Sequence, residues 1–253
     1  MRTQIKFIGT GSGKTSLKRF HSSILIKTEN NNLLIDCGDS TSKALKSAGV
    51  QFQEINTILF SHFHADHFAG IASLITQMKL EERFNPLTIY TPPGLKPKLT
   101  SFLNSTYMFR EILDFELTIL EFQFENRFDI TDAFGVLPHR NSHIENKHKL
   151  KGYGDVFNSA SFLFNLSGKN IFYTADIGST ADLDLIPDQT DILIIETTHI
   201  PLQKIQELTT QKQNVKIILT HISDEDEDSI ENLCEEDQSG NLIIAYDELT
   251  IPI

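Results

Sequence analysis

The sequence predicts an α/β fold built around a mostly parallel sheet, and three observations support this prediction. Short apolar runs typical of buried strands alternate along the chain with segments of helical periodicity. Polar residues of the types that bind metals follow several of these runs, where open α/β sheets place their sites. The 253 residues, 40% of them hydrophobic, suffice for one large core, so we expect a single domain over residues 1–253.

The first elements are predicted to be strands. Gln4–Ile8 is expected to form the first of them, and Ser22–Lys27 and Asn32–Asp36 the next two. Between them lies the glycine-rich stretch GTGSGKTSLKRF. It differs from a nucleotide-binding P-loop, because Gly9 precedes Gly13 by four positions rather than five and a strand follows.

The stretch Thr57–Gly70, TILFSHFHADHFAG, holds three histidines and an aspartate within six residues behind an apolar run. His62 and His64 are two residues apart, so in extended chain both imidazoles leave the backbone on the same side and can converge on one cation. Asp66 and His67 point in different directions as a helix begins and can serve a second cation. Imidazole and carboxylate ligands suit zinc, manganese or iron rather than calcium or magnesium. A solvated loop or a helix cap is the alternative for a lone histidine.

Further ligand candidates follow later strands. The expected elements are helices over Ser40–Ala48 and Phe68–Met78, a strand over Leu87–Thr91, antiparallel strands over Phe115–Phe122, Arg127–Ile130 and Ala133–Leu137, a hairpin of Ser161–Leu166 with Asn170–Ala175, and strands over Ile192–Ile195 and Val215–Leu219. Asp176 and His221 come directly after two of these strands. His139 and His143 follow another, and roughly 13 Å of extended chain separates them, so only one can reach a site built around His62.

Two carboxylates also end predicted strands. Asp36 ends the strand in LLIDCGD, where it could cap the helix that follows or hold a metal-bound histidine from behind. We expect Glu196, at the end of a later strand, to support a metal-bound histidine in the same way.

The formal charge of −12 is concentrated in one segment, because Asp224–Asp237 holds nine of the 34 acidic residues and no Lys or Arg. Basic residues gather near the N-terminus, and Lys14 and Arg19 are expected to bind a substrate phosphate, with a solvated face as the alternative. Neither a secretory h-region nor a run of eighteen apolar residues is present, so we expect a cytoplasmic protein without a membrane segment. Cys37 and Cys234 form no C-x-x-C pair, which argues against thiolate metal binding.

The order of these motifs resembles the metallo-β-lactamase superfamily and, within it, the ribonuclease Z family of tRNA 3′-processing endonucleases. The resemblance runs nearly end to end and rests on FIGTGSG, LLIDCGD, SHFHADHFAG, PLTIYTPPGLK, FYTADIG, DILIIETTH and IILTHIS. It implies a four-layer αββα sandwich with a dinuclear metal centre along one edge of the two sheets.

The resemblance also implies a role for each ligand candidate. His62 and His64 would bind the first metal together with a later histidine. We assign that position to His143 rather than His139, because FGVLPHRNSH is similar to the strand that runs into the family's histidine.

The second metal would be bound by Asp66, His67 and His221, and Asp176 would bridge both ions. The resemblance therefore implies two divalent cations, zinc in the first place, with manganese and iron as alternatives.

Three departures from the ribonuclease Z pattern bear on the substrate. The long glycine- and proline-rich arm that grips tRNA is absent, and the family's H-S-T box is replaced by ETTHIP, so His199 is an imperfect substitute for its histidine. After His221 and Ile222 the chain continues as SDEDED, and dense negative charge beside the metal edge should repel an RNA backbone.

We therefore expect a metal-dependent hydrolase that acts on small or cyclic phosphodiesters, with Asp66 orienting the attacking water and His199 as the general acid. Three alternatives stay open: a tRNA 3′-endonuclease, an acyl hydrolase of the thioesterase or lactonase type, and a metal-binding interaction module with little turnover. A homodimer is kept open beside a monomer.

Overall fold

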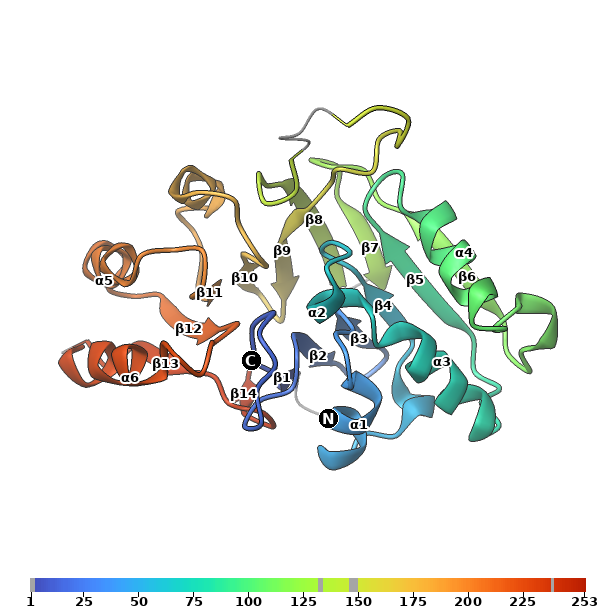
Figure 1. The fold of residues 1–253 in the computed structure, drawn as a ribbon. Helices are drawn as coiled ribbons and strands as arrows, with labels where there is room; N and C mark the ends of the chain where they lie inside the picture. The colour runs from blue at the N-terminus through green and yellow to red at the C-terminus, as the bar shows by residue number, and fades with distance from the viewer. Residues whose placement is uncertain (1–2, 132–133, 146–149, 238) are drawn as a thin grey trace.

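The computed structural model describes residues 3–131, 134–145, 150–237 and 239–253, and its strands form two sheets (Figure 1). Within these residues each sheet has seven strands. The first sheet has the spatial order β14 (Thr250–Pro252), β1 (Gln4–Gly9), β2 (Ser23–Lys27), β3 (Asn32–Ile35), β4 (Thr57–Leu59), β5 (Leu87–Thr91) and β6 (Leu117–Glu121). The second has the order β13 (Leu242–Ile244), β12 (Lys216–Thr220), β11 (Ile192–Glu196), β10 (Lys169–Tyr173), β9 (Ala160–Leu166), β8 (Phe134–Arg140) and β7 (Phe128–Thr131).

Each sheet has a parallel half and an antiparallel half, so the prediction of a mostly parallel sheet holds for only one half of each. In the first sheet β3 to β6 run parallel, whereas β14, β1 and β2 pair antiparallel. In the second sheet β10 to β13 run parallel, whereas β7, β8 and β9 pair antiparallel. Parallel strands end at the same edge of a sheet, so side chains that follow them are brought together there.

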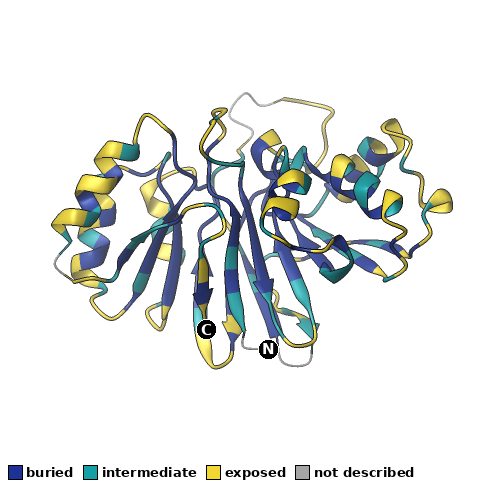
Figure 2. Cartoon of the chain, turned by 90° about the horizontal axis from the view of Figure 1, so that it is seen from below, coloured by how far each residue is buried: buried dark blue, intermediate teal, exposed yellow. Residues whose placement is uncertain are grey.

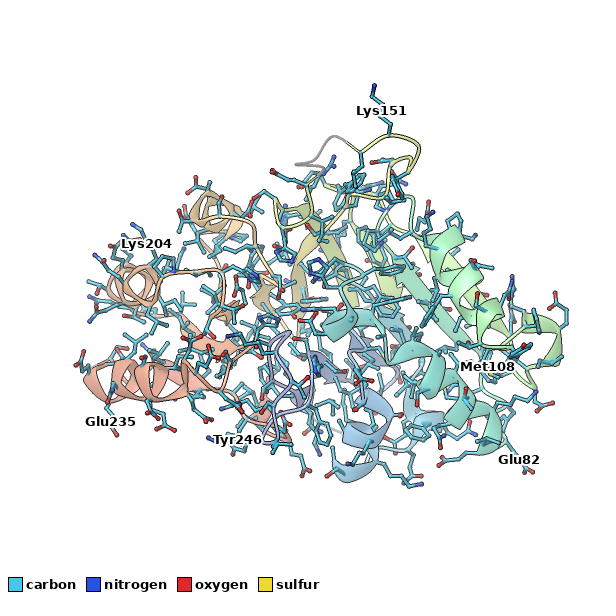
Figure 3. The ribbon with its side chains drawn as sticks, viewed as in Figure 1. Glu82, Met108, Lys151, Lys204, Glu235 and Tyr246 are labelled. Carbon is cyan, nitrogen blue, oxygen red and sulfur yellow. The ribbon has the colours of Figure 1, made fainter. Side chains whose placement is uncertain are left out.

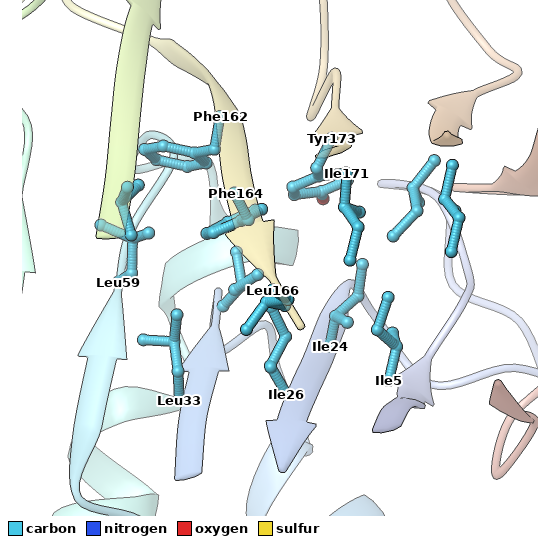
Figure 4. Close-up of a cluster of buried hydrophobic side chains, with 14 of the residues drawn as sticks. Ile5, Ile24, Ile26, Leu33, Leu59, Phe162, Phe164, Leu166, Ile171 and Tyr173 are labelled. Carbon is cyan, nitrogen blue, oxygen red and sulfur yellow. The ribbon is translucent and has the colours of Figure 1, made fainter. Parts of the chain in front are cut away.

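The central core lies between the inner faces of the two sheets (Figure 4). Ile5, Ile24 and Leu33 of the first sheet face Phe162 and Phe164 of the second, and all five are buried. Fully burying a side chain of this size stabilises the fold by about 1.5–3 kcal/mol relative to exposure. The apolar side chains on the inner face of each sheet therefore pack against those of the other sheet.

Helices form the two outer layers. One buried cluster packs the first sheet against α1 (Thr41–Ser47), α3 (Ile71–Leu80) and α4 (Lys96–Ser105). Another packs the second sheet against α5 (Leu202–Gln211) and α6 (Glu227–Glu236). Figure 2 shows buried strands at the centre and exposed helix faces on both outer sides. The predicted four-layer αββα sandwich is confirmed.

The shorter helical elements lie in connections. They are the α-helical turn α2 (Ala65–Phe68) and the 3₁₀ turns η1 (Phe52–Glu54), η2 (Arg110–Ile112) and η3 (Thr180–Leu185). None of the helices in the described part of the chain has the length and apolar character needed to span a bilayer.

One predicted strand direction was wrong. The segment Phe115–Phe122 was expected to pair antiparallel with its successors, but β6 pairs parallel with β5. The side chains of β6 alternate because this edge strand buries one face against α4 and exposes the other. Such one-sided burial occurs in both parallel and antiparallel strands, so the pattern does not reveal the direction of pairing. The predicted antiparallel pairing of β7 with β8 is confirmed, although Ala133 lies outside the described residues. The predicted β9–β10 hairpin is also confirmed.

Candidate metal centre

The candidate ligands lie in four connections that meet at one edge of the sandwich. The loop after β4 carries the four ligand-type residues of the HFHADH motif, and β8, β10 and β12 run into His143, Asp176 and His221. The loop after β4 also reaches the other sheet, because the amide of Ala160 donates a hydrogen bond to the carbonyl of Ser61. This contact joins the loop of the first sheet, which carries four candidate ligands, to the second sheet, whose strands lead to the other three.

The chain turns sharply where it enters this edge. Asp36, Ala175 and His221 each follow a strand and have positive φ values of 59°, 47° and 57°. Residues with side chains adopt this region rarely, at a cost of about 1–3 kcal/mol each, and such positions concentrate at functional sites. Gly38 allows the loops to pack closely, since a Cβ there would lie 2.1 Å from the carbonyl oxygen of Asp66.

Among the described residues three groups of side chains at this edge could hold a metal ion, and the first two share Asp176. Glu196, His199 and His221 form the third. The first group is His62, His64, His143 and Asp176, and the second is Asp66, His67, Asp176 and His221. In each group the candidate ligand atoms lie within 4.8 Å of one another.

The atoms of the two groups point inward. In the first, Nε2 of His143 lies 3.1 Å from Nδ1 of His64 and 3.7 Å from Oδ2 of Asp176. In the second, Nε2 of His221 lies 3.1 Å from Oδ2 of Asp66, and Nε2 of His67 lies 3.2 Å from Oδ1 of Asp176.

The donor set fits a pair of cations. Nε2 of His62, Nε2 of His67 and Oδ1 of Asp176 are buried and make no hydrogen bond. Leaving such a buried polar atom without a partner costs about 1–3 kcal/mol. Three such atoms lie close together here, and a partner that accepts lone pairs from both nitrogen and oxygen would satisfy all of them. A transition-metal ion has that property.

Hydrogen bonds from behind fix the orientation of the histidines. Nδ1 of His67 donates to Oδ2 of Asp36 at 2.8 Å, which leaves Nε2 facing the site. The hydroxyl of Ser61 donates to the same carboxylate and lies 3.0 Å from Nδ1 of His62. On the other side, Nδ1 of His221 lies 2.8 Å from the hydroxyl of Thr198.

Burial tunes the protonation of this site. It lowers the pKa of His62 well below the ordinary value, lowers that of His64, and lowers that of His143 to about 4. Neutral imidazoles are the form that binds a metal. For Asp66 burial acts in the opposite direction, but the hydrogen bond from His221 and the charges of His67 and His221 together outweigh it and bring the carboxyl pKa down to about 2.

His67 differs from the other histidines. Burial disfavours its charged form, but the carboxylates of Asp176 and Asp36 outweigh burial and raise its pKa well above the ordinary value. A metal cation bound at this position would interact with the same two carboxylates, and its binding would release the proton of His67.

His199 and Glu196 form a pair beside the ligand groups. Oε2 of Glu196 accepts hydrogen bonds from the amides of Thr198 and His199 at 2.6 and 2.8 Å. Its other oxygen, Oε1, lies 3.3 Å from Nδ1 of His199. The nearby carboxylate of Glu196 raises the pKa of His199, so this histidine stays protonated at higher pH than a free one.

The structure separates the two candidate histidines that follow β8. His143 lies in the first ligand group, with its ring 4.8 Å from the ring of His62. His139 points elsewhere, with Nδ1 2.7 Å from a carboxylate oxygen of Glu125.

The ligand groups open into a cavity of about 340 Å³. It is lined by Ser12, Gly13, Lys14, His64, Asp66, His143, Asp176, Thr198, His199, His221, Ser223 and Asp226. Lys14 therefore lies at the cavity, as a substrate-binding residue must. Arg19 does not line it, because its guanidinium donates to the hydroxyl of Thr10, the carbonyl of Ala245 and the carboxylate of Glu227.

Sequence reasoning missed two residues that orient ligands, Ser61 and Thr198. Each stands beside a motif that the sequence did single out, Ser61 before the first histidine and Thr198 after Glu196. Adjacency to those motifs was the available signal, but a hydroxyl in such a place is also common in turns.

Comparison with known proteins identifies the family. A family model described as Anti-Pycsar protein Apyc1 matches residues 3–243. The chain belongs to this family. It is also similar to ribonuclease Z of Archaeoglobus fulgidus, with 26% identity over 315 aligned positions that cover 100% of this chain and 98% of the relative. The ribonuclease Z of Picrophilus torridus is 30% identical, over 58% of this chain and 47% of its own length, so the chain spans about half of that relative.

Solved structures share the fold. The metallo-β-lactamase fold protein YhfI from Bacillus subtilis superposes with a TM-score of 0.78 at 17% identity, covering 99% of each chain. Zn²⁺-bound PqqB from Methylobacterium extorquens superposes with a TM-score of 0.72 at 14% identity, covering 99% of this chain and 100% of its own. The predicted resemblance to the metallo-β-lactamase superfamily and to ribonuclease Z is thus confirmed.

Proposed function

We propose that the chain is a metal-dependent phosphodiesterase that hydrolyses small or cyclic phosphodiesters with two divalent cations, zinc in the first place. The observation that carries this proposal is the pair of ligand groups that share Asp176. Two cations about 3.5–4 Å apart activate a water molecule and stabilise the attacking and leaving oxygens of a phosphodiester. Seven side chains would hold them: His62, His64, His143, Asp66, His67, His221 and the shared Asp176.

The chain itself supplies three further functions. Asp66, whose low pKa keeps it ionised, orients the attacking water through its carboxylate. His199, held protonated by Glu196 at Nδ1, donates the proton on Nε2 to the leaving oxygen. Lys14 at the cavity offers its ammonium to a substrate phosphate.

The size of the cavity supports a small substrate. Its volume of about 340 Å³ is near the lower end of ligand pockets, which run from about 300 to 1,000 Å³, and matches one nucleotide better than a folded RNA. The family's name describes proteins that act against Pycsar, and we propose that role as the biological setting of the activity.

Cleavage of pre-tRNA 3′ ends is the second candidate. The full-length similarity to a ribonuclease Z favours it. Against it stand the missing glycine- and proline-rich arm and the carboxylates around the cavity, which oppose a long polyanion.

One substrate panel tests the proposal. Protein reconstituted with zinc or manganese is assayed with bis-p-nitrophenyl phosphate, cyclic mononucleotides, pre-tRNA and p-nitrophenyl butyrate. We expect metal-dependent hydrolysis of the first two. His62→Ala serves as the inactive control for contaminating enzymes. Efficient pre-tRNA cleavage at physiological salt would establish the second candidate instead, and turnover of the acyl ester alone would make the chain an acyl hydrolase.

A further inference from the structure

The rim of the cavity is built from two oppositely charged segments far apart in sequence. We name residues 14–19 the basic loop and residues 224–228 the acidic turn. Lys14 pairs with Glu225, and Lys18 pairs with Glu227. Both segments border the cavity directly, the basic loop through Lys14 and the acidic turn through Asp226.

The base of the basic loop is fixed independently of these pairs. The carboxylate of Asp247 accepts hydrogen bonds from the amides of Thr10 and Phe20, at the two ends of the loop. The amide of Ser12 donates to the carbonyl of Ile222, beside His221. The loop is therefore held at the metal edge even without its exposed lysines.

The pairs differ in their surroundings. Arg19 and Glu227 are 2.9 Å apart, and their side chains are only 8% and 16% exposed, so this pair belongs to the packing of the loop. Lys14 and Glu225 are 66% and 72% exposed, so a substrate can compete for the lysine. Exposed pairs of this kind are weak.

Charge is not balanced across the rim. The basic loop carries three cations, at positions 14, 18 and 19, whereas the acidic turn carries five carboxylates in DEDED. Every basic side chain has an acidic partner, and negative charge is left over beside the cavity. A substrate group that extends from the metal centre toward this rim meets a negative field.

We infer that the acidic turn is a charge filter that restricts the site to phosphodiesters with a single negative charge. The inference rests on the proposed function and names its substrate class more closely. The single charge of a small phosphodiester is compensated at the metal centre. A second phosphate nearby would have to displace Glu225 from Lys14 and approach Asp226.

The test compares two substrates that differ by one terminal phosphate. The dinucleotide UpU has one phosphodiester charge, and pUpU adds a dianionic 5′-phosphate. The filter variant is Asp224→Asn, Glu225→Gln and Asp226→Asn together, and it leaves Glu227 in place because that residue holds the buried Arg19.

A matched control removes the same charge elsewhere. Glu231, in the middle of α6, and Glu235 and Glu236, at its C-terminal end, are all changed to Gln, and Figure 3 shows Glu235 directed outward from that helix. Both variants have the same net charge, so a difference between them reports the position of the charge and not its sum.

We expect wild-type kcat/KM for pUpU to be about tenfold below that for UpU, and the filter variant to close most of this gap while the control does not. The gap should shrink at 0.5 M salt, because the screening length falls well below the roughly 10 Å of 0.1 M salt. Equal kcat/KM values for both substrates in the wild type, or equal gains in both variants, would overturn the inference.

A binding experiment distinguishes failure of this inference from failure of the proposed function. Calorimetry on the zinc-loaded protein measures the affinity for UMP and for uridine 3′,5′-bisphosphate, neither of which requires turnover. A selective gain for the bisphosphate in the filter variant supports the charge filter even if neither dinucleotide is hydrolysed, in which case the proposed function fails alone. An unchanged ratio of affinities overturns the filter whatever the activity.

Discussion

Oδ1 of Asp176 lies 3.2 Å from Nε2 of His67, and neither atom has a hydrogen-bond partner although both are buried. The second oxygen of the same carboxylate faces His143 in the other ligand group. One side chain thereby links two candidate metal positions, and this link distinguishes a dinuclear centre from two separate histidine clusters.

Asp176→Asn is expected to disrupt both positions. The amide keeps the shape of the side chain but removes the negative charge that two cations would share. We expect fewer than one metal ion per chain by elemental analysis and a loss of phosphodiesterase kcat of more than about 100-fold, since even outer partners of metal ligands contribute about 10–100-fold. Wild-type metal content in this variant would exclude a bridging role.

Asp36→Asn tests whether the carboxylate of Asp36 orients the candidate ligand His67. Asn tolerates the positive φ of 59° at this position, so the fold should persist. The carboxylate accepts from the backbone amide of Ser61 at Oδ1 and from Nδ1 of His67 at Oδ2, whereas Asn has one acceptor oxygen and cannot satisfy both donors. We expect a fall of about 10–100-fold in zinc affinity at the second group, measured by competition with a chelator. Ser61→Ala, which leaves the Asp36–His67 contact intact, should have the smaller effect.

His143 and His139 offer a direct comparison between neighbours on one connection. His143→Ala should remove metal from the first group and lower activity at least 100-fold. His139→Ala removes the contacts with Glu125 and with the ring of Phe172, neither of which is a candidate ligand, and should retain wild-type metal content. The opposite pattern would transfer the ligand role to His139.

Glu196→Gln is expected to change the pH profile. The carboxylate raises the pKa of His199, so its removal lowers that pKa and deprotonates the histidine at lower pH. If protonated His199 is the acid, the alkaline limb of kcat/KM for a cyclic nucleotide should move to lower pH.

The leaving group provides the control for this prediction. General acids contribute about 10²–10⁴-fold when the leaving oxygen is a poor one. The p-nitrophenolate of bis-p-nitrophenyl phosphate needs no proton, so the same variant should hydrolyse it with little change in its pH profile. A similar shift for both substrates would argue that Glu196 acts on the metal ligands instead.

The apolar runs of the sequence predicted an α/β fold and the gathering of ligand candidates, whereas the four-layer sandwich was implied by the resemblance to the metallo-β-lactamase superfamily. Buried parallel strands read as apolar runs, and Asp176 and His221 lie within three residues of the ends of two such strands, β10 and β12. Parallel strands end at one edge, so residues distant in sequence could be placed together without knowing any contact.

Other features could not be predicted, because they depend on contacts between distant segments. Arg19 was expected at a phosphate, but its partner Glu227 is 208 positions away, and no local pattern reports such a pair. The direction of β6 likewise depends on its neighbour β5, whereas the alternation of its side chains reports only burial.

Titration of metal-free protein with zinc tests the central claim most directly. Hydrolysis of bis-p-nitrophenyl phosphate is measured as zinc is added to chelator-treated protein in sub-stoichiometric steps. We predict no activity without metal, and a rate that rises to saturation at two zinc ions per chain. Full activity in the absence of metal, or saturation at one ion per chain, would contradict a dinuclear phosphodiesterase.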